Sequence, residues 1–107
     1  MSEYQVRILP AAWEDLAQIE VWYALRFDTD TAIKVSSSIL DAIERLETHP
    51  ESGTRTPDET LNGLGYRMII CKYHAAIYKT VEKTIYIYHI ADMRTDYMKT
   101  IRGTLPG

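Results

Sequence analysis

Residues 65–97 read GYRMIICKYHAAIYKTVEKTIYIYHIADMRTDY, and this stretch decides the fold. It contains three short runs rich in isoleucine, tyrosine and valine, namely Tyr66–Cys71, Tyr73–Thr80 and Thr84–Ala91. Each run predicts a strand, because β-branched and aromatic side chains suit a pleated, half-buried surface. The links between the runs are too short for parallel crossovers, which need about a dozen residues. The stretch therefore predicts a three-stranded antiparallel meander, followed by a polar segment from Asp92 to Tyr97.

The residues before this stretch predict one strand and two amphipathic helices. Tyr4–Ile8 alternates apolar and polar residues, which predicts a strand with one buried face. Pro10 suits the first turn of a helix, where its missing N–H is not needed. Two apolar stripes then recur at three- and four-residue spacing, which is typical of helices with one buried face. The first stripe is Ala12, Leu16, Ile19, Tyr23 and Phe27, and the second is Ala32, Val35, Ile39, Ile43 and Leu46.

The helix ends also carry sequence signals. Glu14 and Asp15 are expected in the first turn of the first helix, where acidic groups favour the helix dipole. The second helix is predicted from about Thr31 to Glu47. His49-Pro50 ends it, because a residue before proline disfavours the helical conformation. The short link between the helices predicts an antiparallel helical hairpin.

Together these elements predict one α+β domain over residues 1–107. The expected order is an N-terminal strand, an antiparallel two-helix hairpin and the three-stranded antiparallel meander. Both helices should pack on one face of a mainly antiparallel sheet, with the first strand beside the last. Glu51–Leu64 reads as a long loop, and Thr95–Ile101 as one or two helical turns. The residues expected in the buried core are Leu16, Ile19, Tyr23, Val35, Ile39, Ile43 and Leu46.

Composition excludes several classes of function. The net charge of −3 is unusual for proteins that grip nucleic acid through many phosphates, and no lysine- or arginine-rich run compensates for it. No apolar run reaches the roughly eighteen residues of a membrane span, so no membrane partner is expected. His49, His74 and His89 lie far apart without a supporting cysteine pair, so we expect neither a metal site nor a cofactor. Cys71 fits a small buried hydrophobe of a reducing cytosol, and the N-terminus lacks a signal peptide, so a cytoplasmic location is expected.

The order of these elements and their residues resembles the RelE/ParE superfamily, the toxins of bacterial type II toxin–antitoxin pairs. The similarity covers nearly the whole chain and is nearer to the ParE and plasmid-stabilisation branch than to the ribonuclease branch. Its parts are short, and the ordered set carries the resemblance. They are Pro10–Leu16 with Ile19, Leu46 with His49-Pro50, Gly65–Arg67, Tyr73-His74 with Ile77-Tyr78, Ile85–Ile87 and Met93–Tyr97.

This resemblance implies two alternative activities. RelE-type members are similar to ribosome-dependent nucleases that cut mRNA, whereas ParE-type members look like non-enzymatic inhibitors of DNA gyrase. Both types are silenced by a small antitoxin that wraps the toxin, so the implied partners are a cognate antitoxin in a hetero-oligomer and either gyrase or ribosome-bound mRNA. Trp13 and Trp22 fall on different sides of the first helix, so we expect Trp22 to be exposed. Trp13 or Trp22, together with the tyrosine-rich strands, is expected to anchor the antitoxin.

If the chain is a nuclease, RNA cleavage needs a base, an acid and cations that stabilise the crowded phosphate. The resemblance places Arg67, Arg94, His74, His89 and Tyr97 as the candidate catalytic residues. The basic constellation is incomplete, because two further positions where the nuclease branch carries basic residues are Ile69 and Ala75. Asp92, two residues before Arg94, would also lower the local potential for an RNA backbone.

The incomplete cluster and the acidic balance favour the gyrase-type activity. An mRNA endoribonuclease and an inactive relative that only binds its antitoxin stay open as alternatives. The lone histidines and arginines also have ordinary structural roles in sheets, where a histidine is more often hydrogen-bonded than catalytic.

Overall fold

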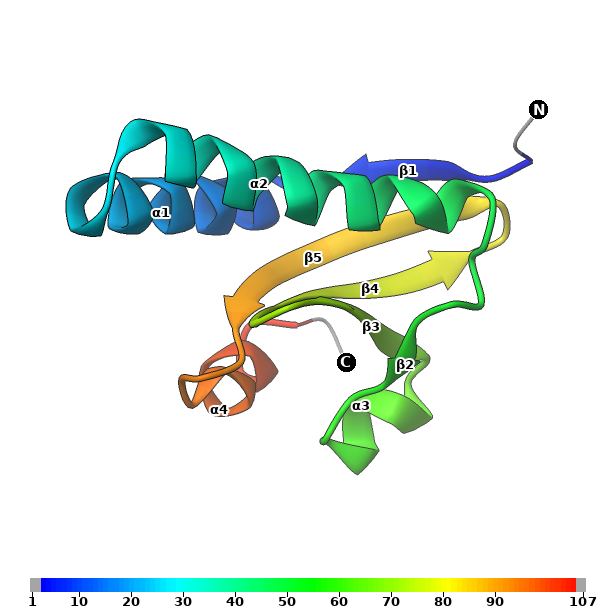
Figure 1. The fold of residues 1–107 in the computed structure, drawn as a ribbon. Coiled ribbons are helices and arrows are strands. Elements are labelled where there is room, and N and C mark those ends of the chain that lie inside the picture. Colours follow the sequence, from blue (N-terminus) through cyan, green and yellow to red (C-terminus); the bar gives the residue numbers. More distant parts are fainter. Residues whose placement is uncertain (1–2, 106–107) are drawn as a thin grey trace.

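A computed structural model of the protein describes residues 3–105, and within them a five-stranded sheet carries two long helices and two short ones (Figure 1). The strands are β1 (Gln5–Ile8), β2 (Thr54–Arg55), β3 (Tyr66–Cys71), β4 (His74–Val81) and β5 (Thr84–Asp92). The helices are α1 (Pro10–Arg26), α2 (Thr29–Glu44), α3 (Glu59–Gly63) and α4 (Tyr97–Arg102), and a 3-10 turn over Arg45–Glu47 extends α2.

The sheet has the strand order β1-β5-β4-β3-β2. The antiparallel pairs β3–β4 and β4–β5 form the predicted meander, and β1 lies parallel to β5, beside the last strand as expected. The pairing of β1 with β5 stops at Ile8 and Ile87, because the chain then turns into α1 at Pro10. Within residues 3–105 the outer edge of β5 beyond Ile87 therefore has no neighbouring strand.

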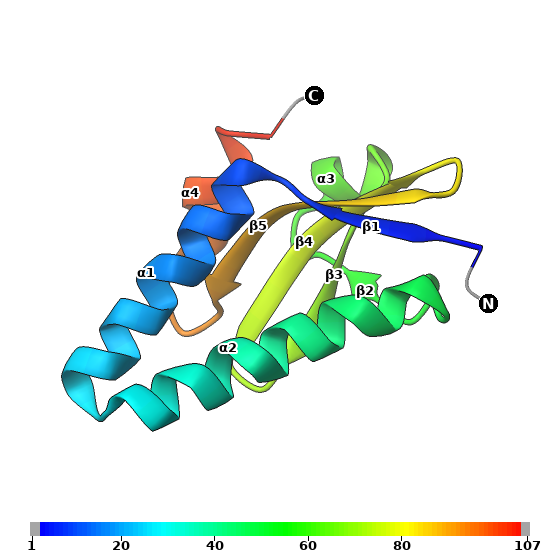
Figure 2. The same cartoon turned by 90° about the horizontal axis from the view of Figure 1, so that it is seen from above.

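The helical hairpin covers one face of the sheet (Figure 2). Pro10 stands at the first turn of α1, and Asp28 caps α2 by accepting a hydrogen bond from the Thr31 backbone N–H at 2.7 Å. The main core lies between the hairpin and the sheet. Its fully buried members are Ala12, Leu16, Ile39, Ile43, Leu46, Ala76, Tyr78, Ile85, Ile87 and Ile90.

The predicted core was right for Leu16, Ile39, Ile43 and Leu46, which are all buried. Ile19, Tyr23 and Val35 are only half-buried, and Phe27, which we placed on the same apolar stripe, is 65% exposed. The reason is geometric: the end of the hairpin where α1 meets α2 projects beyond the sheet, so the stripe continues where no sheet lies beneath it (Figures 1 and 2). The expected exposure of Trp22 is confirmed.

A second, smaller core lies on the opposite face, which corrects two expectations. Residues 51–64 are not a simple loop, because Thr54 and Arg55 pair with β3 and α3 follows, with the Asp58 side chain accepting from the Leu61 N–H. As predicted, α1 and α2 pack together on one face of the sheet. The short helices α3 and α4 pack on the opposite face, where no helix was expected. Their cluster contains Leu61, Tyr66, Met68, Ala75, Ile77 and Ile101.

Candidate functional site

A pocket of about 370 Å³ lies at the end of β5, between α1 and α4. It is lined by residues of four regions: α1, the start of β4, the end of β5 and the segment around α4. Its walls are Asp15, Gln18, Ile19, Trp22, Tyr23, His74, His89, Ile90, Ala91, Asp92, Thr95, Tyr97, Thr100, Ile101 and Thr104. Three of the five predicted site residues, His74, His89 and Tyr97, are among them.

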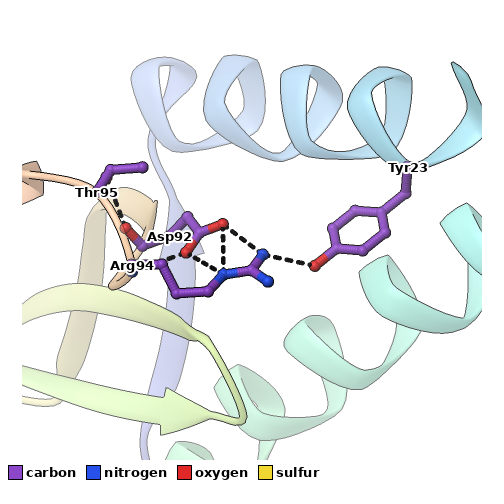
Figure 3. Close-up of polar contacts among 4 residues, drawn as sticks. All are labelled: Tyr23, Asp92, Arg94 and Thr95. Carbon is purple, nitrogen blue, oxygen red and sulfur yellow. Dashed lines mark hydrogen bonds and ion pairs between the residues drawn. The ribbon is translucent and has the colours of Figure 1, made fainter. Parts of the chain in front are cut away.

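Arg94 lies beside this pocket and is held by an adjacent carboxylate (Figure 3). Its Nη2 donates to Asp92 Oδ2 at 2.7 Å and its Nε to Asp92 Oδ1 at 2.9 Å, while Nη2 also donates to the Tyr23 hydroxyl at 3.1 Å. The guanidinium lies 4.5 Å from the centre of the Tyr73 ring. The hydrogen bond from Arg94 lowers the pKa of Asp92, and the same bond raises the pKa of Arg94. The positive charge of Arg94 is therefore already compensated by a carboxylate.

His74 forms the inner wall of the pocket. Its side chain is buried, its ring lies 5.8 Å from that of Tyr23, and its Nε2 is the one buried side-chain nitrogen or oxygen without a hydrogen-bond partner within residues 3–105. Burial lowers the pKa of His74, while the charge of Asp92 opposes this effect and that of Arg94 adds to it. The imidazole is therefore held in its neutral form near neutral pH.

His89 joins three parts of the chain on the other side of the pocket. Its Nδ1 lies 2.8 Å from Asp15 Oδ2 of α1, and its Nε2 lies 2.8 Å from the hydroxyl of Thr104, after α4. Asp15 Oδ2 also accepts the backbone N–H of Ile90 at 3.0 Å. This N–H belongs to the unpaired edge of β5, so Asp15 takes the place of the missing strand.

Of the remaining two candidates, Tyr97 lines the pocket and Arg67 does not. Tyr97 begins α4, its hydroxyl reaches Met68 Sδ at 3.9 Å, and burial raises its pKa. Arg67 donates to the backbone carbonyls of Tyr66 and Asn62 at 2.8 and 3.3 Å. Arg67 pairs with Tyr78 of β4, four residues from the pocket end of that strand at His74, or about 13 Å along the strand. The structure thus gathers His74, His89, Tyr97 and Arg94 at one place and leaves Arg67 at another.

Residues 6–97 match the family described as the ParE toxin of type II toxin–antitoxin system, parDE. The match covers most of the sequence. The chain belongs to this ParE toxin family.

Solved structures show the same fold for this ParE-family chain. It is similar to a chain of the chromosomal ParDE toxin–antitoxin system from P. aeruginosa, with a TM-score of 0.72 and 21% identity over 84% of this chain and 96% of the other. It is also similar to a chain of the RelBE2 toxin–antitoxin complex from Mycobacterium tuberculosis, with a TM-score of 0.62 and 15% identity over 83% of this chain and 96% of the other. No curated protein matches the sequence.

Several residues of the site were not identified from the sequence of this ParE-family chain. Asp15 was expected in the first turn of α1 for its effect on the helix dipole, but it lies beyond that turn and binds β5 instead. Tyr23, predicted in the core, lines the pocket instead, and no sequence pattern indicates a role for Thr104. A sequence signal did exist for Asp15: it stands one residue before the buried Leu16, on the border of the apolar stripe.

The chemistry of the site is aromatic and acidic rather than basic. Trp22, Tyr23 and Tyr97 supply rings, and Asp15 and Asp92 supply carboxylates that are already paired with His89 and Arg94. Within residues 3–105 no lysine or arginine lines the pocket itself. Within residues 3–105 no group of three or more histidine, cysteine, aspartate or glutamate side chains could hold a metal ion. In that same part of the chain no helix has the length and apolar character needed to cross a membrane.

Proposed function

We propose that this ParE-family toxin inhibits growth by binding DNA gyrase without cleaving RNA, and that a cognate antitoxin neutralises it in the cytoplasm. The observation that carries the proposal is the ion pair of Arg94 with Asp92, with N–O distances down to 2.7 Å. A nuclease of this fold would need that arginine to meet a phosphate. Here a carboxylate of the same turn already occupies the guanidinium.

Arg67 and His74 are also poorly placed to stabilise a phosphate. A phosphate in the transition state gathers negative charge, so its stabilisation needs several converging cations. Arg67 lies about 13 Å further along the sheet and is bound to backbone carbonyls. His74 is neutral because it is buried. The pocket therefore offers little electrostatic attraction to an RNA backbone. This favours a protein over RNA as the target.

The antitoxin part of the proposal is supported by the exposed apolar surface of α1 and of the start of α2. Large exposed apolar patches commonly mark protein-binding sites. The exposed large apolar side chains of these segments are Val21, Trp22, Leu25, Phe27 and Ile33, with Trp13 on a different side of α1, and they are between 42% and 82% exposed. The two similar solved chains come from ParDE and RelBE2 toxin–antitoxin systems, which suits such a partner. Co-expression with the product of an adjacent short reading frame should yield a stable hetero-oligomer, and a toxin that stays alone contradicts this part.

The alternative is a RelE-like mRNA endoribonuclease, and one observation favours it. His74, His89 and Tyr97 line the same pocket, so residues capable of acid–base chemistry do converge. A third possibility, an inactive relative that only binds its antitoxin, predicts no toxicity at all.

One experiment in cells separates the three activities. The wild-type chain, Arg67→Ala and Arg94→Ala are induced in a bacterial host, and growth, mRNA 5′ ends and a DNA-damage reporter are followed together. The proposal predicts growth arrest with a DNA-damage response and intact mRNA. If the wild type cuts ribosome-bound mRNA and either variant lowers cleavage about a hundredfold, or about 2.7 kcal/mol, the nuclease alternative is correct. Absence of growth arrest at equal protein level identifies the inactive relative.

A further inference from the structure

The tip of the helical hairpin, where α1 ends and α2 begins, exposes a connected group of large apolar side chains. Their exposed fractions are 57% for Val21, 42% for Trp22, 82% for Leu25 and 65% for Phe27. On α1, Leu25 follows Val21 by four residues and Trp22 by three, so these side chains are neighbours on the helix surface. The ring centres of Trp22 and Phe27 are 6.4 Å apart. We call these four residues the tip patch.

The tip patch has the size of one half of a small protein interface. Its exposed fractions correspond to roughly 450 Å² of apolar surface, taking about 150–250 Å² for each complete side chain. Single exposed apolar residues are ordinary, but a connected patch of this size commonly marks a contact surface. Two such patches facing each other would bury roughly 900 Å², and a polar rim brings the total close to the lower limit of specific interfaces, about 1,000 Å². The patch is therefore large enough for a weak interface with a patch of the same size.

Two exposed side chains of opposite charge stand beside the tip patch. Arg26 lies in the last turn of α1, with its guanidinium 4.9 Å from the centre of the Trp22 ring. Asp30 lies in the first turn of α2. Within residues 3–105 neither Arg26 nor Asp30 forms an ion pair, whereas the nearby Asp28 carboxylate is occupied as the cap of α2. The tip thus carries both members of an ion pair, unpaired, on the rim of one apolar patch, which makes this surface complementary to itself.

We propose that the tip patch is the interface of a twofold-symmetric dimer, formed by two copies of this chain without antitoxin. A twofold axis brings the same patch of both copies together, so each Arg26 would meet the Asp30 of the other copy. The contact would then have an apolar centre and a charged rim, which is the usual build of protein interfaces. The dimer goes beyond the proposed function and does not depend on it. An antitoxin bound to the same surface would exclude the second copy.

The first test is analytical ultracentrifugation of the purified full-length chain at physiological salt. The wild type should show a monomer–dimer equilibrium with a dissociation constant on the order of 100 µM, as suits a small interface. Leu25→Glu should raise this constant at least about tenfold, because a carboxylate would then be buried in the apolar centre. Ile70→Glu is the matched control, since Ile70 is a 44% exposed isoleucine of β3, and it should leave the equilibrium unchanged. A monomeric wild type, or equal effects of the two substitutions, overturns the proposal.

The two rim charges test the twofold symmetry directly. Both side chains are exposed, so Arg26→Glu and Asp30→Arg should each fold. Each variant alone would place like charges at both rim contacts and should weaken self-association about fivefold. An equimolar mixture of the two variants should recover wild-type association, because the introduced glutamate meets the introduced arginine while the native Asp30 meets the native Arg26. A mixture that associates no better than the separate variants contradicts the twofold arrangement.

The antitoxin is the competing occupant of the tip patch, and the same variants distinguish it from a second copy. If the chain alone stays monomeric while Leu25→Glu weakens its complex with the antitoxin, the patch belongs to the antitoxin and the dimer proposal is wrong. The ultracentrifugation experiments use the toxin alone. A missing antitoxin complex would therefore contradict the proposed function while leaving the dimer standing.

Discussion

Asp15 is the residue on which the geometry of the site depends most. Its single carboxylate oxygen Oδ2 accepts from the Ile90 N–H at 3.0 Å and from His89 Nδ1 at 2.8 Å. It thus fixes the unpaired edge of β5 to α1 and orients the histidine that reaches Thr104.

Replacing Asp15 by alanine should therefore destabilise the fold by about 1–3 kcal/mol, because the Ile90 N–H loses its acceptor in a largely enclosed place. Urea unfolding followed by circular dichroism measures this change. Glu14→Ala is the matched control: Glu14 is exposed on the same helix, and its loss should stay within about 0.5 kcal/mol. Equal effects of the two substitutions would show that the Asp15 bonds do not hold the strand edge.

His74 should titrate below its ordinary pKa of 6.5 in the folded chain, because burial disfavours the charged imidazole. The unfolded chain then binds the proton more readily. The contribution of His74 to stability is consequently full above pH 6.5 and is lost as the pH falls through the folded pKa. NMR titration of the ring signals gives the pKa directly, and His74→Gln should flatten the fall in unfolding free energy below pH 6.5. A measured value at or above 6.5 refutes this account of the site.

The sequence indicated most of the residues near the site, but not which side chains contact one another. His74, His89 and Tyr97 line one pocket with Arg94 beside it, whereas Arg67 lies elsewhere on the sheet. The ion pair of Arg94 follows from Asp92 two residues earlier, a proximity visible in the sequence. The bond from Asp15 to His89 joins residues 74 positions apart, and no local pattern encodes it.

Helix α2 carries apolar residues both on its buried face and on its exposed face. Ile43 is buried against the sheet, whereas Ile33 on the same helix is 52% exposed because it lies off the buried stripe, since its neighbours Ala32 and Ser36 are only 4% and 7% exposed. Ile43→Ala should cost about 2–5 kcal/mol of unfolding free energy, and Ile33→Ala less than about 0.5 kcal/mol. The two isoleucines have the same chemistry, so the difference isolates the effect of position. A similar loss in both would mean that the hairpin packs differently.

The elements missed from the sequence are the short ones. β2 has only two residues, and α3 only five, too few for a hydrophobic period to be visible. One local signal for α3 was present, since Asp58 follows Pro57 and caps the helix through the Leu61 N–H. The longer strands β3, β4 and β5 were predicted within one or two residues because their composition alone determines them.

At the scale of the whole molecule, membership of the ParE family and the incomplete basic cluster support the same activity. The sheet keeps the architecture of the toxin fold, yet the cations that RNA cleavage would require are paired or distant. The surface at the end of the helical hairpin is aromatic and apolar instead. A molecule with these properties is suited to binding a protein target.

Gyrase inhibition is tested most directly by a supercoiling assay with purified DNA gyrase and purified full-length toxin, run beside a cleavage assay on ribosome-bound mRNA. We predict dose-dependent inhibition of gyrase and no mRNA cleavage. Arg94→Ala should keep the chain free of nuclease activity, because Arg94 has no phosphate to stabilise. Unaffected gyrase together with mRNA cleavage that Arg94→Ala abolishes would contradict the account.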